Sequence, residues 1–187
     1  MNYDRLTYSH ALDDGVSLRT LRARDAAALY SLIDGSREYL REWLPFLDDA
    51  QGPDATHGFI LEASRLADEG KGVAVGIWDG EVLVGVIGLT EISKRNRHAE
   101  IGYWLGHEHQ GRGLMTRACR AVITYCFDVV GLHRVAIYCA PGNMRSRAIP
   151  ERLGFVEEGT MREAEWLYDH FVDNVVYSML DRDWGSP

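Results

Sequence analysis

The sequence predicts an α+β fold in which a mixed, mostly antiparallel, twisted sheet of about seven strands carries helices on both faces. The strongest evidence is a hairpin pattern, because residues 73–78 and 82–89 are apolar and Asp79-Gly80 separates them. A second pattern places a buried strand at residues 101–105, followed by two glycines and a long amphipathic helix. Since strand and helix patterns alternate in this way, a sheet with helices packed on it is expected.

The N-terminal part of the chain predicts one strand and three helices. Residues 16–22 alternate between apolar and polar side chains, which is typical of a strand. Asp25 is placed to cap a helix with an apolar stripe, and a short second helix stops at Pro45. A third helix is expected to begin at Asp54 or Thr56, because apolar residues at helical spacing follow.

After the hairpin, further strands alternate with two helices. Apolar residues from Met115 to Val130 recur at helical spacing, and Gly131 is expected to end this long helix. The remaining expected elements are strands at 99–105, 133–139, 155–167 and 172–180 and a helix at 144–153. No internal repeat, low-complexity tract or linker occurs, so residues 1–187 are expected to form one domain.

Composition and charge narrow the functional classes. The chain has 187 residues, 46% of them hydrophobic, and a net charge of -8, so binding to nucleic acid or to an anionic membrane is not expected. The cysteines at 119, 126 and 139 lack metal-ligand spacing, so neither a metal site nor a disulfide framework is expected. Residues 1–10 lack the apolar core of a signal peptide and no apolar run has membrane-spanning length, so a cytoplasmic location is expected.

Residues 110–116, with the sequence Gln-Gly-Arg-Gly-Leu-Met-Thr, connect the strand at 101–105 to the long helix. Two glycines let a ligand approach the backbone closely, and the start of a helix offers unpaired N–H groups and the positive end of the helix dipole. An anion, usually a phosphate, is therefore the expected ligand. The alternative interpretation is a surface turn that only needs flexible glycines.

The order of the elements and three spaced motifs resemble the GNAT superfamily of N-acetyltransferases. The motifs are Gln110-Gly111-Arg112-Gly113, Asn143-Met144-Arg145-Ser146 and Leu153-Gly154-Phe155. Residues 99–105, 113–116 and 131–135 are similar, more narrowly, to the RimJ/RimL-like ribosomal-protein N-terminal acetyltransferases. The superfamily's phosphate turn, Gln/Arg-x-x-Gly-x-Gly/Ala, ends on a small residue, whereas this chain has Met115 there. The resemblance covers essentially the whole chain and implies a single GNAT-type domain.

The resemblance implies acetyl-CoA as the donor of an acetyl group. Backbone N–H groups of the turn would hold its pyrophosphate, and the strand end before the turn would pair with its pantetheine arm and help to stabilise an oxyanion. The implied cofactor-binding residues are Trp104, Leu105, Gln110, Gly111, Arg112, Gly113, Leu114, Met115, Thr116 and Asn143. Met115 is compatible with this if it is helical, because only backbone contacts are needed there. The arginines placed to add positive charge are Arg112, Arg117 and Arg120.

Two residues at the start of the helix at 144–153 have both a structural and a functional interpretation. Asn143 is placed to cap the helix, and the resemblance implies that it also hydrogen-bonds the pantetheine arm. Ser146 is either an ordinary first-turn serine or the group that protonates or hydrogen-bonds the leaving thiolate, as the RimL-like pattern implies. Pro150 has no N–H for the Ser146 carbonyl, so a helix that continues through it leaves that carbonyl free or bends beside Ser146.

A carboxylate is expected to accept the proton that an attacking amine loses. Glu165 stands where RimL-like enzymes carry a proposed catalytic glutamate, whereas Glu100 lies on the strand where other branches of the superfamily place a base. The alternative for either side chain is an ion pair on a face of the sheet.

The resemblance thus implies an acetyl-CoA-dependent N-acetyltransferase in which a primary amine, a protein N-terminus, attacks directly in a ternary complex. Two alternatives stay open: an acetyltransferase of a small cationic amine, which the acidic balance favours, and a non-catalytic acyl-CoA-binding protein. Asp169-His170-Phe171 departs from the family pattern in a loop that borders the acceptor site, so the specificity of the family need not transfer.

Trp43, Leu44, Phe46 and Leu47 form an apolar patch in a connecting region. Burial in the core is the favoured interpretation, and a pocket wall is the alternative. Because members of the superfamily often dimerise, an exposed patch is also a candidate interface for a homodimer.

Overall fold

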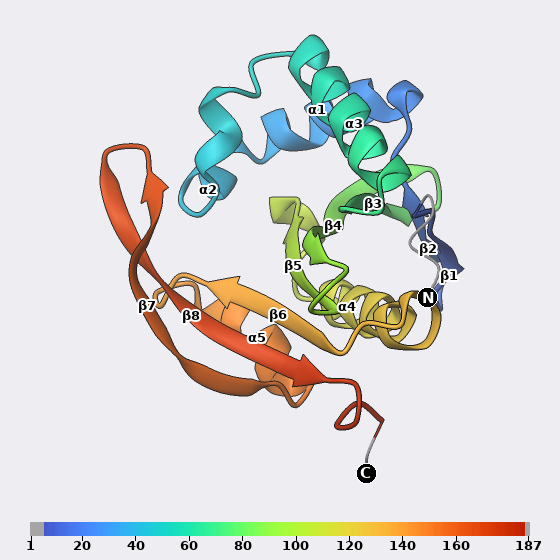
Figure 1. Cartoon of the computed structure of the whole chain (residues 1–187). Helices are drawn as coiled ribbons and strands as arrows, with labels where there is room; N and C mark the ends of the chain where they lie inside the picture. Colours follow the sequence, from blue (N-terminus) through green and yellow to red (C-terminus); the bar gives the residue numbers. More distant parts are fainter. Residues whose placement is uncertain (1–5, 186–187) are drawn as a thin grey trace.

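The computed structural model describes residues 6–185 and contains an 8-stranded sheet flanked by helices (Figure 1). The strands are β1 (Ser9–Ala11), β2 (Val16–Thr20), β3 (Val73–Asp79), β4 (Val82–Ser93), β5 (His98–Leu105), β6 (Arg134–Cys139), β7 (Val156–Leu167) and β8 (His170–Leu180). The α-helices are α1 (Ala26–Gly35), α2 (Arg37–Arg41), α3 (Pro53–Asp68), α4 (Leu114–Tyr125) and α5 (Met144–Arg152). Shorter helical segments are η1 (Ala23–Asp25), η2 (Pro45–Asp48), η3 (His107–His109) and the π-helical η4 (Cys126–Val130).

The strand order is β1-β2-β3-β4-β5-β6-β8-β7, and among residues 6–185 every pair of neighbouring strands is antiparallel except β5 and β6. This confirms the predicted α+β class with a mixed, mostly antiparallel sheet, but the expected number of strands is too low by one. The additional strand, β1, pairs with β2 across a turn in which Asp14 and Gly15 have positive φ. Its three residues are all exposed and show no apolar alternation, so periodicity does not reveal it.

Helices cover both faces of the sheet, as predicted. Helices α1 to α3 pack with Ala74, Trp78 and Val86 in one core cluster, whereas α4 and α5 pack with Val135 and Ile137 in another. Figure 1 shows α1 and α3 at the top of the view and α4 and α5 at the bottom. Within residues 6–185, no helix has both the length and the apolar character needed to cross a bilayer.

Helix α4 follows the glycine turn directly and buries one side against the sheet. Its buried side chains are Leu114, Met115, Ala118, Cys119, Val122 and Ile123. The helical path continues through η4 and ends at Gly131, as predicted, where φ is 78°. Cys119 and Cys126 are buried, as predicted, and burial raises the pKa of both thiols, so they pack as small apolar side chains.

Strands β7 and β8 form a long hairpin that projects past the end of β6 and curves toward α2 (Figure 1). The pairing of β6 with β8 runs from Val175 to Leu180, while β7 and β8 stay paired outward to Leu167 and His170. At the hairpin tip, the hydroxyl of Tyr168 donates to the backbone carbonyl of Leu44, just after α2. The hairpin is thus joined to a segment far from it in the sequence.

A hydrogen-bonded ion pair joins β6 to the β7–β8 hairpin. Arg134 donates to both carboxylate oxygens of Glu158 at 2.6 Å, and Ser178 Oγ donates to one of them at 2.7 Å. These hydrogen bonds, that of Arg134 foremost, lower the pKa of Glu158 to about 2. Because the folded-state pKa lies below the value of the unfolded chain, the contact stabilises the fold above the unfolded pKa and is lost as the pH falls through the folded one.

The Glu158→Gln variant is therefore expected to have a lower Tm than the wild-type protein near neutral pH. The difference in Tm is expected to shrink as the pH falls from the unfolded pKa of 4.5 toward the folded pKa of about 2, which thermal unfolding by circular dichroism can follow. Glu81→Gln is the control, because Glu81 is exposed and forms no ion pair with any described residue. A Tm difference for Glu158→Gln that does not change with pH would contradict the assignment.

Candidate functional site

Two adjoining cavities lie where β5, α5 and the segment after α2 come together. The turn cavity, of about 970 Å³, is lined by the glycine turn at 110–116, the end of β5 and the start of α5. The hairpin cavity, of about 1160 Å³, is lined by β5, the tip of the β7–β8 hairpin and residues near α2. The residues that line both are Trp43, Leu44, Tyr103, Asn143 and Ser146. The two cavities therefore meet at these side chains.

The glycine turn lies where the sequence predicts an anion site. All seven of its predicted binding residues line the turn cavity: Gln110, Gly111, Arg112, Gly113, Leu114, Met115 and Thr116. Gly111 and Gly113 have φ values of +77° and +68°, and a Cβ added at either would meet no other heavy atom within 4 Å. Gly113 is the N-cap of α4. Met115 lies in the first turn of this helix, and its side chain is buried in the core. The backbone of Met115 thus remains at the helix N-terminus, where the predicted backbone contacts are needed.

Apart from two tyrosines, the ionisable side chains that line the turn cavity are basic, and no described Asp or Glu lines it. The basic residues are His107, Arg112, Arg117, Arg145 and Arg152. Arg112 Nη1 also donates to Asp79 Oδ2 at 2.7 Å. Arg120 is not brought to this cavity, since its guanidinium lies 5.6 Å from the centre of the Trp184 ring. Basic side chains beside a helix N-terminus provide the electrostatic environment that a phosphate or pyrophosphate requires.

Gln110 connects the glycine turn to α5 and has an unused donor. Its Oε1 accepts a hydrogen bond of 2.7 Å from Arg145 Nη1, while its Nε2 is buried without a partner in the described structure. A buried donor without an acceptor is unfavourable until a ligand or water accepts from it. The Gln110 amide is therefore available to a polar ligand of the turn cavity.

Trp104 and Leu105 lie at the end of β5, where one edge of the strand is open. On one side they pair with Val86 and Gly85 of β4, whereas the parallel pairing with β6 covers only residues 98–100 of β5. Within the described residues, the main chain after residue 100 thus has no partner strand on the β6 side. An extended ligand can bind such an edge in the manner of an added strand.

Ser146 lies in the first turn of α5 and is held at several atoms. Its N–H donates to Asn143 Oδ1 at 3.1 Å, which confirms the helix cap at Asn143. Helix α5 continues through Pro150, which has no N–H, and the Ser146 carbonyl accepts a hydrogen bond of 2.9 Å from Tyr103 Oη. Ser146 Oγ lies 3.2 Å from Cys139 Sγ and 3.4 Å from Tyr103 Oη.

Both candidate base residues, Glu100 and Glu165, line the hairpin cavity. Burial, followed by the charge of Glu91, raises the pKa of Glu100, and a hydrogen bond with Tyr138 partly opposes this shift. Glu165 Oε2 accepts a long hydrogen bond of 3.4 Å from Asn174 Nδ2. Neither carboxylate forms an ion pair with a described Lys, Arg or His, so the ion-pair alternative does not apply to them.

The apolar patch after α2 is divided between core and cavity wall. Leu47 is 0% exposed, as the core interpretation predicts, but Trp43 and Leu44 line both cavities and Phe46 is 40% exposed. The hydrogen bond from Tyr168 to Leu44 joins this wall to the hairpin tip. The favoured core interpretation is therefore confirmed for Leu47 and wrong for Phe46. Trp43 and Leu44 are half-buried and form the wall of both cavities, although Leu44 also packs against the core.

Sequence reasoning did not assign a function to Tyr103, Tyr138, Arg145 or Arg152, all of which line one or both cavities. For Tyr103 a signal was present, because a proline inside a helix implies that the freed carbonyl takes a donor from elsewhere. The other three residues carry no local pattern that separates them from ordinary surface residues. Among residues 6–185, no group of three or more His, Cys, Asp and Glu side chains is arranged to hold a metal ion.

Comparison with known proteins agrees with this geometry. The family model for the acetyltransferase (GNAT) domain matches residues 16–156. The protein YdaF of Bacillus subtilis (strain 168) is 39% identical over 175 residues, which cover 92% of this chain and 95% of YdaF. The ribosomal-protein-serine acetyltransferase of Escherichia coli (strain K12) is 29% identical over 175 residues, covering 94% of this chain and 98% of the relative.

A solved structure of an acetyltransferase is also similar to this chain. RimL, a ribosomal L7/L12 alpha-N-protein acetyltransferase crystallised in complex with coenzyme A, has a TM-score of 0.89 to this chain at 25% identity. The match covers 92% of this chain and 98% of RimL. Since the family match spans most of the chain and includes the glycine turn and Ser146, this protein belongs to the GNAT acetyltransferase family.

Proposed function

We propose that this protein transfers the acetyl group of acetyl-CoA to a primary amine within a ternary complex. The observation that carries the proposal is the meeting of two cavities of opposite charge at Tyr103, Asn143 and Ser146. The basic turn cavity suits a donor with phosphate groups, and the acidic hairpin cavity suits an acceptor that arrives as an ammonium ion. Direct transfer requires the two substrates to be held next to each other, and adjoining cavities allow this.

Acetyl-CoA fits the groups that the turn cavity offers. Backbone N–H groups between residues 111 and 116, with the unused donor of Gln110, would bind the pyrophosphate. The open edge of β5 at Trp104 and Leu105 would pair with the extended arm of the donor. Asn143 keeps its Nδ2 donor for the same arm while its Oδ1 caps α5. The coenzyme A bound to the related RimL supports this choice of donor.

For the chemistry, we assign the hydrogen bond to the leaving thiolate to Ser146 and the proton acceptor to Glu165. The amine nitrogen attacks the thioester carbonyl carbon, the carbon–sulfur bond breaks with its electron pair on sulfur, and Ser146 Oγ–H stabilises the thiolate. Glu165 takes the proton that the amine loses, directly or through a water. Glu100 is the second candidate base, because its raised pKa makes it a stronger base than an ordinary glutamate.

The acceptor is proposed to be cationic. Among the described residues, the hairpin cavity is lined by six carboxylates: Glu42, Asp48, Glu91, Glu100, Glu165 and Asp169. Its two basic residues are already bonded, Arg41 to Asp48 at 2.9 Å and His170 to Asp169 at 2.7 Å. The excess of negative charge attracts an ammonium group and repels an acidic peptide.

A protein N-terminus is the first candidate acceptor, since related enzymes are ribosomal-protein acetyltransferases. A small cationic amine is the second candidate, which the acidic lining supports. A cytoplasmic location would place the enzyme with ribosomal proteins. The homodimer, the lack of nucleic-acid and membrane binding, and the single domain over residues 1–187 stay predictions.

Calorimetry with coenzyme A, followed by a thiol-release assay with acetyl-CoA and a panel of amines, tests the proposal. Coenzyme A is expected to bind, and peptides with a free N-terminus are expected to be acetylated, whereas the same peptides with a blocked N-terminus are not. Basic peptides are expected to react faster than acidic ones, with a difference that falls as salt is added. Absence of coenzyme A binding would overturn the donor, and binding without turnover of any amine would instead indicate an acyl-CoA-binding protein.

A further inference from the structure

One backbone hydrogen bond is missing from α5, and a side chain from β5 replaces it. Pro150 lies inside the helix and has no N–H, so the carbonyl of Ser146, four residues earlier, lacks its helical donor. Tyr103 Oη donates to this carbonyl at 2.9 Å from a position 43 residues away in the sequence. The tyrosine hydroxyl therefore replaces the hydrogen bond that proline removes.

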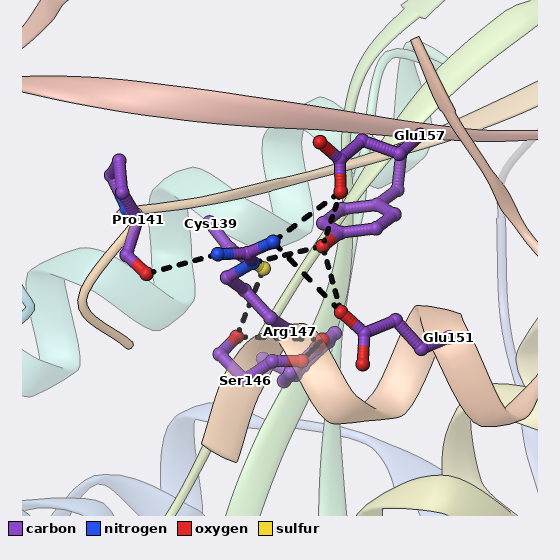
Figure 2. A network of polar contacts seen from close by, with 8 residues as sticks. Cys139, Pro141, Ser146, Arg147, Glu151 and Glu157 are labelled. Atoms are coloured by element: carbon purple, nitrogen blue, oxygen red, sulfur yellow. Dashed lines mark hydrogen bonds and ion pairs between the residues drawn. The ribbon is translucent and has the colours of Figure 1, made fainter. Parts of the chain in front are cut away.

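The same hydroxyl lies next to the Ser146 side chain. Tyr103 Oη is 3.4 Å from Ser146 Oγ. Since its own proton is used for the Ser146 carbonyl, it accepts a long hydrogen bond from Ser146 Oγ–H in the free enzyme, and Ser146 Oγ–H donates to the sulfur instead when the thiolate forms. Cys139 Sγ lies 3.2 Å from Ser146 Oγ (Figure 2). Together with the Asn143 cap at its N–H, Ser146 is held at its nitrogen, its carbonyl oxygen and its hydroxyl.

The environment of Tyr103 preserves its function as a donor. Burial raises the pKa of Tyr103 well above its usual value, with the nearby Cys139 and Cys119 adding to the shift, so the hydroxyl stays protonated across the working pH range. Tyr103 also immediately precedes Trp104 on β5, next to the open strand edge. The hydrogen bond thus connects the serine on α5 to the strand that is proposed to bind the donor.

We propose that Tyr103 is a positioning residue for Ser146, which it orients by supplying the hydrogen bond that Pro150 withholds. The inference rests on the proposed function, in which Ser146 Oγ–H stabilises the leaving thiolate. In an uninterrupted helix, the N–H of residue 150 would satisfy the Ser146 carbonyl whatever the position of β5. With proline at 150, this carbonyl depends on the Tyr103 hydroxyl, which fixes the backbone of Ser146 and so the direction of its Oγ–H.

The Tyr103→Phe variant is expected to lower kcat about tenfold, the effect of a misoriented hydrogen-bond donor, and to leave the KM for acetyl-CoA within about twofold. Pro150→Ala restores the N–H at position 150, so Tyr103→Phe/Pro150→Ala is expected to recover most of the lost kcat. Pro150→Ala alone is expected to resemble the wild-type enzyme. A double variant no faster than Tyr103→Phe alone would overturn the inference.

The matched control is Tyr177→Phe, because this buried tyrosine also bonds α5 but at other residues. Its hydroxyl accepts from Arg147 Nε at 2.9 Å and donates to Glu151 at 3.0 Å, and both of these α5 residues are labelled in Figure 2. Loss of this hydroxyl is expected to lower the Tm but to leave kcat within about twofold, because Ser146 keeps its own bonds. An equal loss of kcat in both variants would indicate a general effect of loosening α5 and would overturn the inference.

A double-mutant cycle with Ser146→Ala separates this inference from the proposed function. If Tyr103 acts through Ser146, adding Tyr103→Phe to Ser146→Ala is expected to change kcat less than about twofold. Additive losses would overturn the positioning function of Tyr103 while leaving Ser146 in its proposed place. A Ser146→Ala enzyme with the wild-type kcat would instead remove Ser146 from the proposed mechanism, and the inference with it.

Discussion

Replacing Glu165 by glutamine is expected to lower kcat about a hundredfold, the usual contribution of a general base, while the Kd for coenzyme A stays unchanged. Glutamine keeps the size of the side chain and an oxygen that can accept the 3.4 Å hydrogen bond from Asn174, but it cannot take up a proton at neutral pH. The measurement is a thiol-release assay with an N-terminal peptide, supported by calorimetry with coenzyme A.

Glu100→Gln is the matched comparison, because both carboxylates line the hairpin cavity. Its expected loss of kcat is below about tenfold, since it removes a negative charge near the acceptor but not the proposed proton acceptor. A large loss for Glu100→Gln together with a small one for Glu165→Gln would reverse the assignment. In that case Glu100 would be the base.

The second large effect is expected at the glycine turn. Gly113→Val should raise the Kd for coenzyme A about a hundredfold, because a β-branched residue resists positive φ and its side chain enters the open space beside the N–H groups of α4. Gly113 has a φ of +68° and no heavy atom within 4 Å of an added Cβ, so the substitution clashes with a bound phosphate and not with the protein. Calorimetry with coenzyme A measures the change.

Gly15→Val controls for the strain of the backbone itself. Gly15 has a φ of +75° and equally open surroundings, but it lies in the turn between β1 and β2 and lines neither cavity. A similar decrease in Tm is expected for both variants, with weaker coenzyme A binding only for Gly113→Val. If both variants lost coenzyme A to the same extent, the glycine turn would not be the phosphate site.

Local patterns in the sequence were sufficient for most of the secondary structure. The hairpin of β3 and β4, the long helix from the glycine turn to Gly131 and the cap at Asn143 follow from neighbouring residues, and all three are present. Strand β1 was missed because its three exposed residues carry no apolar alternation, and it exists only by pairing with β2. Phe46 is exposed and Trp43 and Leu44 are only half-buried, because hydrophobicity does not distinguish a core from the wall of a cavity.

Local sequence patterns predict the glycine turn before α4, the capped start of α5 and the missing donor at Pro150, because each depends on residues close together in the chain. Packing of distant elements is needed for Tyr103 to supply that donor, and for Glu100 and Glu165 to share the hairpin cavity with Ser146. These contacts join β5, α5 and the β7–β8 hairpin, whose relative positions depend on strand register and helix packing. Local periodicity specifies which face of an element is buried, but not which distant side chain it meets there.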